Sequence, residues 1–458
     1  MVNDEIVSGE SSTSGESSTN NESSTRKDSS TVAPTISNGY RNYVLFILTL
    51  IYAFNFIDRQ IIGILSPFIK ADLGLDDAQL GWLKGIYFAL LYTILGIPIA
   101  WLADRYSRVN IVTISLTLWS GFTAVSGLAG NFTQLALARI GVGIGEAGGS
   151  PPSHSIISDL FPKEKRASAL AIYSLGIPFG IMLAFFASAF FLKGGEADWR
   201  TVLIAVGLPG VALAILLKLT VKEPARSGNM QTVSAQGKSW QSIKELLSIK
   251  SWWGMCFAIS FGSFGNYAIS TWMIDFYVRA HAGLDITQFL IILGIINGTA
   301  YAGGVWLGGV LVDKWGKTNR SAYGLVPALA LVVGAPAYYF SLQVESLELS
   351  IALVTILLFT SGFYLGPSFA LAQTLAPVKV RAMSTALFFF VLNIIALGGG
   401  PTFIGVLSNF YTEQHGEVES LRLSLSWLAV PYVMSIIAFF WTAKHIPNDW
   451  KAAEIRNG

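Results

Sequence analysis

Two adjacent charged residues, Asp58 and Arg59, lie inside a long apolar stretch that runs from about Tyr43 to Ile69. At 1.5 Å per helical residue, this stretch is long enough to cross a bilayer core of roughly 30 Å. A charge at the centre of such a helix costs about 2.5–3.5 kcal/mol, and it is kept where it faces protein or water and serves a function. Neighbouring residues of a helix point about 100° apart, so we expect Asp58 and Arg59 each to have a further partner.

A second pair of charges, Arg139 and Glu146, lies in another apolar stretch, seven residues apart. Seven residues are close to two helical turns, which places both side chains on one face, about 10.5 Å apart along the axis. Glycines surround them and either let helices pack closely or leave room for a ligand. Counting residues inward puts the first pair at a depth between Arg139 and Glu146. We therefore predict a network in which Arg59 pairs with Glu146, and Asp58 pairs with Arg139 or carries a proton.

This network could bind an anion and carry protons. Burial favours the protonated form of a carboxyl group, and a nearby arginine favours the charged form. Asp58 and Glu146 are therefore candidates for proton coupling. A guanidinium matches phosphate or carboxylate with a fork of N–H donors, so Arg59 and Arg139 are candidates for contacting an anionic substrate. A permanently closed ion-pair cluster that only locks helix packing is the alternative interpretation.

Aromatic and amide side chains from the second half of the chain supply a different wall for the same cavity. The candidates for substrate binding there are Phe264, Tyr267, Tyr364 and Asn393. A cavity that is charged on one wall and mainly aromatic on the other suits an amphipathic molecule. The alternative is that most of these aromatic rings pack against lipid or other helices.

The elements that must position these residues are transmembrane helices. The chain has 458 residues, of which 52% are hydrophobic and only 13% charged, whereas soluble domains carry about 25% charged residues. Its mean hydropathy is +0.55. We predict an all-α membrane protein with twelve transmembrane helices in two six-helix bundles. The apolar stretches are about 43–69, 78–103, 109–129, 132–158, 167–192, 201–221, 250–279, 286–312, 321–341, 348–375, 382–409 and 422–444.

Two polar segments divide the chain. Residues 1–40 are rich in Ser, Thr, Asn, Glu and Gly, so we expect a disordered cytoplasmic tail. Residues 222–249 separate six apolar stretches from six, and their end, from Ser239 to Lys250, has the spacing of a short amphipathic helix on the membrane surface. The expected organisation is a tail (1–40), a bundle (41–221), a cytoplasmic linker (222–249), a bundle (250–445) and a cytoplasmic tail (446–458).

Lysine and arginine are concentrated in alternate loops. Basic residues follow the second, fourth, sixth, eighth and tenth stretches, whereas the other loops carry acidic residues. Because cytoplasmic loops carry the excess of Lys and Arg, this pattern predicts that both termini are cytoplasmic. We expect a multi-pass protein of the cell membrane.

A loop motif occurs once in each half. Residues 100–108 read Ala-Trp-Leu-Ala-Asp-Arg-Tyr-Ser-Arg, and residues 309–317 read Gly-Val-Leu-Val-Asp-Lys-Trp-Gly-Lys. Parallel repeats of this kind are typical of secondary transporters that rock around a central site. The motif resembles the signature G-x-L-A-D-R-x-G-R of the major facilitator superfamily, although Ala100 and Ser107 replace glycines in the first copy. The resemblance implies that this loop acts as a gate. The gating candidates are Asp104, Arg105, Arg108, Asp313 and Lys314.

Three further segments resemble the Spinster family of facilitator transporters. They are Asn55–Arg59, Arg139–Ala147 with Asp159–Pro162 after it, and Trp199–Pro224. The similarity covers mainly the first half of the chain, and the second half is generic. Membership would imply proton-linked transport of lysophospholipids or sphingosine phosphates.

Together these features predict a secondary active transporter that moves an amphipathic anionic lipid by alternating access. A drug or organic-anion transporter on the same fold, and a non-transporting membrane receptor or scaffold, are the alternatives. The motif of ATP-binding loops, GxxxxGK[ST], does not occur, and the four histidines are scattered. We therefore expect no enzyme activity, cofactor, metal or nucleic acid. The expected partners are membrane lipids, the substrate and protons, and we expect a monomer.

Overall fold

The computed structural model describes residues 37–193, 198–225 and 240–457. Residues 38–458 form one compact unit. All regular secondary structure in the described ranges is helical, which confirms the predicted fold class. Most of the expected N-terminal tail, residues 1–36, lies outside the described residues. The predicted end of this tail at residue 40 is wrong by a few residues, because residues 38–40 already belong to the first helix.

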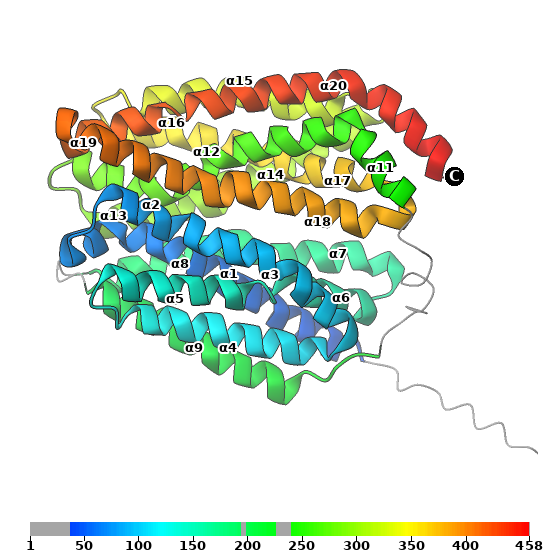
Figure 1. The fold of residues 1–458 in the computed structure, drawn as a ribbon, viewed down its shortest axis with the longest axis horizontal. Helices are drawn as coiled ribbons and strands as arrows, with labels where there is room; N and C mark the ends of the chain where they lie inside the picture. Colours follow the sequence, from blue (N-terminus) through cyan, green and yellow to red (C-terminus); the bar gives the residue numbers. More distant parts are fainter. Residues whose placement is uncertain (1–36, 194–197, 226–239, 458) are drawn as a thin grey trace, which may run out of the picture. The chain divides into compact units, whose positions relative to one another are not determined.

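The first half of the chain forms the bundle drawn in blue to green in Figure 1. Three of its six expected spans consist of two helices each, because the backbone departs from regular α geometry near a glycine or a leucine. The helices are α1 (Asn38–Leu73), α2 (Asp77–Lys84), α3 (Ile86–Arg105), α4 (Arg108–Ser126), α5 (Phe132–Glu146), α6 (Ser150–Leu160), α7 (Lys163–Ser174), α8 (Gly176–Phe191) and α9 (Trp199–Thr220).

The second half forms the other bundle, drawn in green to red. Its α-helices are α11 (Trp240–Ser248), α12 (Lys250–Ala280), α13 (Ile286–Ile296), α14 (Ala302–Gly316), α15 (Ala322–Ser341), α16 (Leu347–Ser361), α17 (Leu365–Leu375), α18 (Arg381–Leu392), α19 (Gly399–Ser426) and α20 (Ala429–Asn457). Two π-helical segments, η1 (Asn297–Tyr301) and η4 (Asn393–Gly398), and two 3₁₀ segments, η2 (Gly362–Tyr364) and η3 (Val378–Val380), join some of them.

Each of the twelve expected apolar stretches is helical in the structure. Within the described residues, nine helical segments are long and apolar enough to cross a membrane, and the last of them, residues 383–457, covers two expected spans. The fourth and seventh expected spans are not among the nine. The fourth is interrupted between α5 and α6, and the seventh, α12, carries several Ser, Thr and Asn residues that lower its hydropathy.

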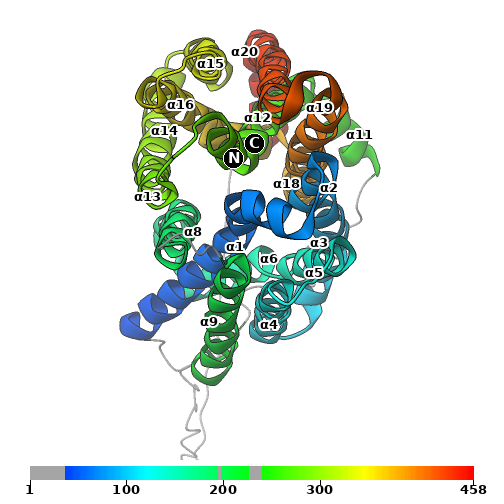
Figure 2. The same cartoon turned by 90° about the vertical axis from the view of Figure 1, so that its left-hand side faces the viewer.

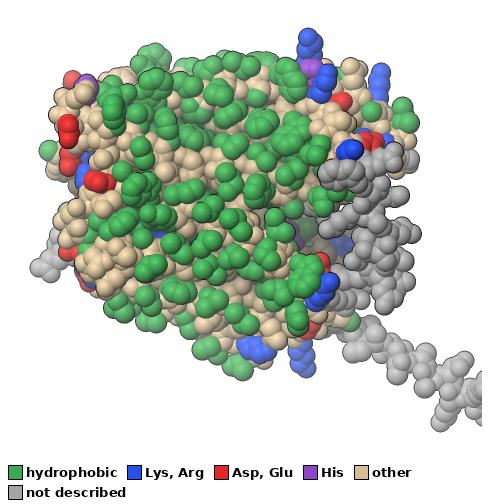
Figure 3. Space-filling view, viewed as in Figure 1, with side chains coloured by type: hydrophobic (Ala, Val, Ile, Leu, Met, Phe, Trp, Pro, Cys, Tyr) green, Lys and Arg blue, Asp and Glu red, His purple; other side chains and the backbone are tan. Residues whose placement is uncertain are grey.

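The two halves meet along two seams. α2 packs against α19 and α8 packs against α13, as Figure 2 shows at the end facing the viewer. We call this end the far side, and the opposite end, where α1 begins and α20 finishes, the terminal side. Apolar side chains cover the middle of the surface in Figure 3, whereas charged side chains gather at its two ends. That distribution is the one expected of a bundle that spans a membrane.

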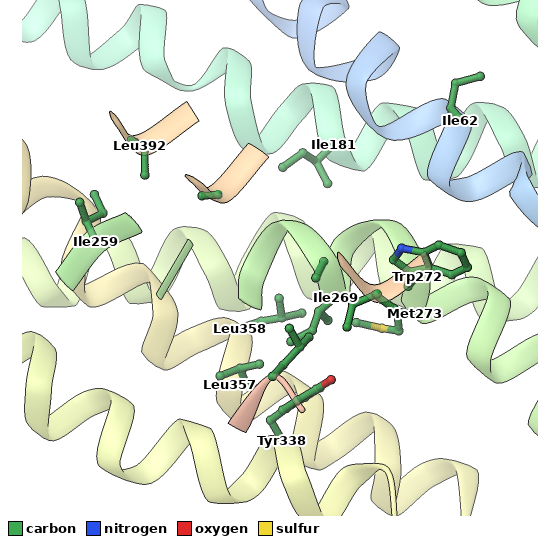
Figure 4. Packing of buried hydrophobic residues seen from close by; sticks show 14 of the residues in the cluster. Ile62, Ile181, Ile259, Ile269, Trp272, Met273, Tyr338, Leu357, Leu358 and Leu392 are labelled. Atoms are coloured by element: carbon green, nitrogen blue, oxygen red, sulfur yellow. The ribbon is translucent and has the colours of Figure 1, made fainter. Parts of the chain in front are cut away.

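One continuous cluster of buried apolar side chains runs through both halves. Figure 4 shows part of it, with Ile269 and Met273 of α12 near Tyr338 of α15. Trp272 of α12 is fully buried, and its Nε1 donates a hydrogen bond to the Pro401 carbonyl at 2.9 Å. α12 is therefore a central packing element of the second bundle.

The terminal side of the second bundle is more ordered than the sequence indicates. The expected amphipathic helix is present as α11, with Leu246 buried. α20 does not end near residue 444 but continues through Pro447 to Asn457. Arg456 near its end pairs with Glu245 of α11 at 3.2 Å. Most of the segment expected to be a C-terminal tail is therefore helix.

Candidate functional site

Four charged residues meet where α1 passes α5. The side chain of Arg59 is only 10% exposed, and its Nε lies 2.8 Å from Oε2 of Glu146, whose side chain is 0% exposed. The ion pair between Arg59 and Glu146 that the spacing predicts is therefore confirmed. It joins α1 to the end of α5 inside the first bundle.

Asp58 and Arg139 do not form the expected pair of side chains. Nη1 of Arg139 donates to the backbone carbonyl of Asp58, at a long 3.4 Å. Oδ1 of the Asp58 carboxyl group is buried without a hydrogen-bond partner. The carboxyl group is near Glu146 and Thr123 as well as Arg139. The other prediction, that Asp58 carries a proton, remains a prediction.

Aromatic rings enclose the Arg59 guanidinium. Its central carbon lies 5.1 Å from the ring centre of Phe56, 5.5 Å from that of Phe88 and 4.6 Å from that of Tyr92. The guanidinium of Arg139 lies 5.3 Å from the Phe88 ring. Phe88 therefore contacts both arginines. Such contacts are worth about 2 kcal/mol or more when they are desolvated.

Sequence reasoning missed these rings. Phe56 lies three residues before Arg59, so helical spacing places the two side chains on one face, and this signal was available. Phe88 and Tyr92 come from α3, and no local pattern links them to α1. The structure supplies that link.

Glycines on α5 allow the helices to approach closely. A Cβ atom on Gly143 would lie 2.7 Å from the Phe88 carbonyl oxygen, and one on Gly145 would lie 2.5 Å from the backbone nitrogen of Trp119. Both distances are too short for a real side chain. Of the two roles expected for these glycines, close packing is the one that the structure supports here.

The candidate residues of the second bundle divide into two groups. Tyr267 of α12 lies close enough to Arg59 to interact with it electrostatically across the bundle interface. Phe264 packs within its own bundle, against Phe403 at 5.8 Å. Tyr364 is fully buried, and its hydroxyl has no hydrogen-bond partner in the described chain. Asn393 is half-buried at the start of the π-helical segment η4. Of these four residues, Tyr267 is therefore the one shown to lie near the charged cluster.

A hollow opens between the bundles on the terminal side. Figure 3 shows it towards the right, between the parts that Figure 1 labels α18 and α3. α6 carries an exposed histidine, His154, whose ring meets that of Tyr173 of α7 edge-on at 5.1 Å. The Tyr173 ring stacks in turn on Tyr52 of α1, at 4.4 Å and 10°. These rings couple α7 to the helix that carries Asp58 and Arg59.

The residues of the loop motifs have different environments. Arg108 is 1% exposed and forms ion pairs with Asp159 and with Glu223, the latter at 2.7 Å. Arg105 is stacked on Trp101 at 3.6 Å. The remaining gating candidates, Asp104, Asp313 and Lys314, are exposed. Arg108 therefore holds the first bundle together on the terminal side, and the gating role of the motif remains a prediction.

A second charged cluster, which sequence reasoning missed, joins the bundles on the far side. Nζ of Lys84 lies 2.6 Å from Oδ2 of Asp275, and both side chains are 0% exposed. The ammonium also lies 3.6 Å from the centre of the Trp272 ring. Ser66 of α1 donates to the same carboxylate oxygen at 2.5 Å. Lys84 therefore forms its ion pair inside the protein, between the two bundles.

Asp77 forms the outer part of this cluster. Both terminal nitrogens of Arg279 donate to its carboxylate, at 2.7 and 2.8 Å, and Ser408 donates at 2.7 Å. Lys70 bridges Asp77 and Glu417, at 3.1 Å each. We call the set Ser66, Lys70, Asp77, Lys84, Asp275, Arg279, Ser408 and Glu417 the far-side lock. It connects α1 and α2 of the first bundle with α12 and α19 of the second.

Neither cluster is arranged to bind a metal. Within the described ranges, no group of three or more His, Cys, Asp or Glu side chains could hold a metal ion. The arrangement can hold charges inside an apolar protein. The charged side chains can also exchange partners, because each carboxylate of the two clusters contacts a cation or a hydroxyl group or lies near one.

The chain is similar to several known proteins. The model of the Major Facilitator Superfamily matches residues 48–401. An MFS-type efflux pump of Mycolicibacterium smegmatis is 29% identical, over 88% of this chain and 92% of its own. Spinster homolog 1 of Xenopus tropicalis is 28% identical, over 91% of this chain and 83% of its own.

A solved structure is similar over its whole length. The crystal structure of a bacterial homolog of the human lysosomal transporter Spinster, in an inward-facing and unoccupied conformation, aligns with a TM-score of 0.82. It is 29% identical in sequence, and the alignment covers 90% of this chain and 99% of that one. In the present structure, the bundles meet through the far-side lock and leave a hollow on the terminal side.

Proposed function

Because the chain belongs to the Major Facilitator Superfamily and is a membrane transporter of the Spinster type rather than an enzyme, we propose that it moves an amphipathic anionic lipid by proton-linked alternating access. The substrate class is a lysophospholipid or a sphingosine phosphate. The observation that carries this proposal is the buried Arg59–Glu146 pair, which lies among aromatic rings beside a second buried carboxyl group.

Arg59 is the anion contact in this proposal. Its guanidinium has five N–H donors, and the pair with Glu146 uses only Nε at 2.8 Å. A phosphate can take up the remaining donors, and the rings of Phe56 and Tyr92 then contact the adjoining apolar part of the substrate. Tyr267 adds a hydroxyl group from the second bundle. A ligand at this point would touch both bundles, as alternating access requires.

The two carboxyl groups supply the proton link. A buried carboxylate without a cation partner is costly, so Asp58 is held at lowest cost with a proton in this conformation. When Glu146 also takes up a proton, it no longer holds the Arg59 guanidinium as an ion pair. Arg59 is then free to bind an anion, and the loss of that proton expels the anion. This exchange couples substrate to protons without any further group.

The far-side lock and the terminal-side hollow supply the two ends of the cycle. The lock must break for the site to open to the far side, because Lys84 and Asp275 belong to different bundles. We propose that the terminal side faces the cytoplasm of a cell membrane, since the basic loops that contain Arg105, Lys165 and Lys317 lie there. In that orientation the structure represents an inward-facing state.

The test is lysophospholipid movement by purified protein in liposomes with an imposed pH gradient. We expect gradient-dependent movement in the wild type and its loss in Asp58→Asn. Glu419→Gln is the matched control, because it removes an exposed carboxylate whose partner is Arg422. Lipid movement that does not depend on the gradient and that persists in Asp58→Asn would contradict the proton link, but it would still support a lipid substrate. No lipid movement in the wild type would contradict the proposed substrate.

A second candidate is supported by the similarity to an efflux pump. An organic anion or drug with a flat apolar part could bind to Arg59 and its rings as a lipid does. The two candidate functions predict a different dependence of transport on the length of the substrate's acyl chain. A lysophospholipid transporter should lose activity as the acyl chain is shortened, whereas a drug carrier should prefer compact anions and show no dependence on acyl-chain length.

A further inference from the structure

A polar pocket lies on the terminal side, away from the central site. Its volume is about 210 Å³, and it is lined by Asn38, Arg41, Asn42, Phe161, Pro162 and Lys165. We call it the α1–α7 pocket, because α1 supplies one wall and the loop before α7 with the start of that helix supplies the other. A water molecule takes up ~30 Å³ in the liquid, so the pocket could hold roughly seven water molecules. A phosphate group with part of a glycerol would occupy a similar space.

The charges of this pocket select an anion. Two cations, Arg41 and Lys165, line it from different elements, together with the amides of Asn38 and Asn42. Nε of Arg41 is buried without a hydrogen-bond partner in the part of the chain that the structure describes. Among the described residues, its Nη1 donates to Oδ1 of Asn38, at 3.5 Å. An arginine with unused donors beside a lysine matches a phosphate.

The backbone at the start of α7 adds to this preference. Pro162 is the N-cap residue of α7 and provides no side-chain hydrogen bond to the first turn. The first N–H groups of a helix carry a partial positive charge and attract anions. Because Pro162 and Lys165 line the pocket, this end of α7 borders the space between the two cations.

The position of the pocket points to a membrane lipid. Tyr43 lies two residues after Arg41, and its hydroxyl donates to Thr220 at the end of α9 at 2.7 Å. Tyrosines of this kind mark the level of the lipid head groups. Phe46 is 63% exposed and lies four residues after Asn42, so it is on the same helix face one turn deeper. A lipid with its phosphate in the pocket would lay an acyl chain along Phe46.

We propose that the α1–α7 pocket binds the phosphate of an anionic phospholipid from the leaflet on the terminal side. This site is distinct from the transport site and does not depend on the proposed substrate. The bound phosphate bridges Arg41 of α1 and Lys165 of α7, the same two helices that the stacked rings of Tyr52 and Tyr173 join further along. The lipid therefore fixes α7 against the helix that carries Asp58 and Arg59.

The test is lipid binding to the purified full chain, measured by native mass spectrometry. Phosphatidylglycerol, phosphatidylcholine and inorganic phosphate are the probes. We expect the wild type to prefer phosphatidylglycerol to phosphatidylcholine by about tenfold or more, and the double variant Arg41→Gln/Lys165→Gln to lose that preference. Lys317→Gln/Lys444→Gln is the matched control, because it removes two exposed cations from the second bundle.

A charge-preserving variant separates loss of binding from loss of folding. Arg41→Lys/Lys165→Arg should keep most of the preference, and all variants should unfold at the temperature of the wild type in phosphatidylcholine. The same affinity for phosphatidylglycerol in Arg41→Gln/Lys165→Gln and wild type would contradict the site. Inorganic phosphate that binds as tightly as the lipid, and depends on the same two cations, would contradict a lipid as its ligand.

Discussion

At the scale of single residues, four buried charges have unequal partners. Glu146 holds Arg59 directly, whereas Arg139 reaches only the backbone of Asp58. The sequence predicts the identity of all four, because charges are conspicuous in apolar stretches and their helical spacing indicates which share a face. It could not predict that Arg139 would donate to the backbone carbonyl of Asp58 and not to its carboxyl group, since that depends on the rotation of α1 against α5.

The unequal partners predict unequal effects on stability. Glu146→Gln leaves the guanidinium of Arg59 buried without its carboxylate, and breaking a buried pair in this way costs about 3–5 kcal/mol. Asp58→Asn removes a carboxyl group that no cation contacts at hydrogen-bond distance, so we expect a change within about 1 kcal/mol. Thermal unfolding in detergent compares the two. Equal losses of stability would show that Asp58 has an ionic partner after all.

The rings around Arg59 predict that lysine is a poor replacement. Arg59→Lys keeps the charge but loses the fork of donors and the flat surface that contacts Phe56, Phe88 and Tyr92. Losing contacts worth about 1–2 kcal/mol raises the KM for transport roughly tenfold. Transport kinetics in liposomes measure this change. An unchanged KM would place the anion somewhere other than at Arg59.

At the scale of helices, the far-side lock depends on the close crossing of α2 and α19. A Cβ atom on Gly405 would lie 2.7 Å from the Gly81 Cα, so only glycine allows this crossing. Lys84 and Asp275 are 191 residues apart, and they pair only because the two bundles touch at this end. A single sequence has no signal for that pairing, because the pairing depends on how the two bundles meet.

Weakening this lock should open the far side. Lys84→Met removes the buried cation and leaves Asp275 with Ser66 and a distant Arg279 at 3.8 Å. The closed state loses a buried pair, so its population falls. Spin labels on the exposed residues Ala71 and Ala282 would report a larger fraction of long distances. Lys193→Met, which removes an exposed lysine after α8, is the control, and the same distances in both variants would exclude a role for the pair.

The start of α4 predicts a dependence on pH outside the membrane. Burial by itself raises the pKa of Glu223, but hydrogen bonds from the Val109 N–H, Arg108 and Ser107 outweigh it and lower the pKa below its ordinary value. Such a group stabilises the fold above its unfolded pKa of about 4.3, and the contribution is lost as the pH falls through the folded value.

Glu223→Gln should therefore lower the unfolding temperature near pH 7, and the difference from the wild type should shrink as the pH falls below about 4. Thermal scans over this range make the comparison. A difference in unfolding temperature that stays constant with pH would mean that the shape of the Glu223 side chain, and not its charge, contributes to stability.

At the scale of the whole molecule, the sequence predicts the architecture well. Twelve apolar stretches, a central polar segment and the repeated loop motif are enough to indicate two bundles of six helices. The breaks within spans are harder to predict. One example is the separation of α5 from α6, which occurs at Gly148 and Gly149, shortly after Glu146. The long α20 was also unexpected, since its end is held by contacts with α11 and not by its own apolar pattern.

The central claim is that Asp58 and Glu146 couple protons to an anionic lipid bound at Arg59. The most direct measurement is proton movement into liposomes when lysophospholipid is added on one side without a pH gradient, followed by an internal pH indicator. We predict lipid-dependent proton movement in the wild type that is absent in Asp58→Asn and in Glu146→Gln. Lipid movement without proton movement in the wild type would contradict the account.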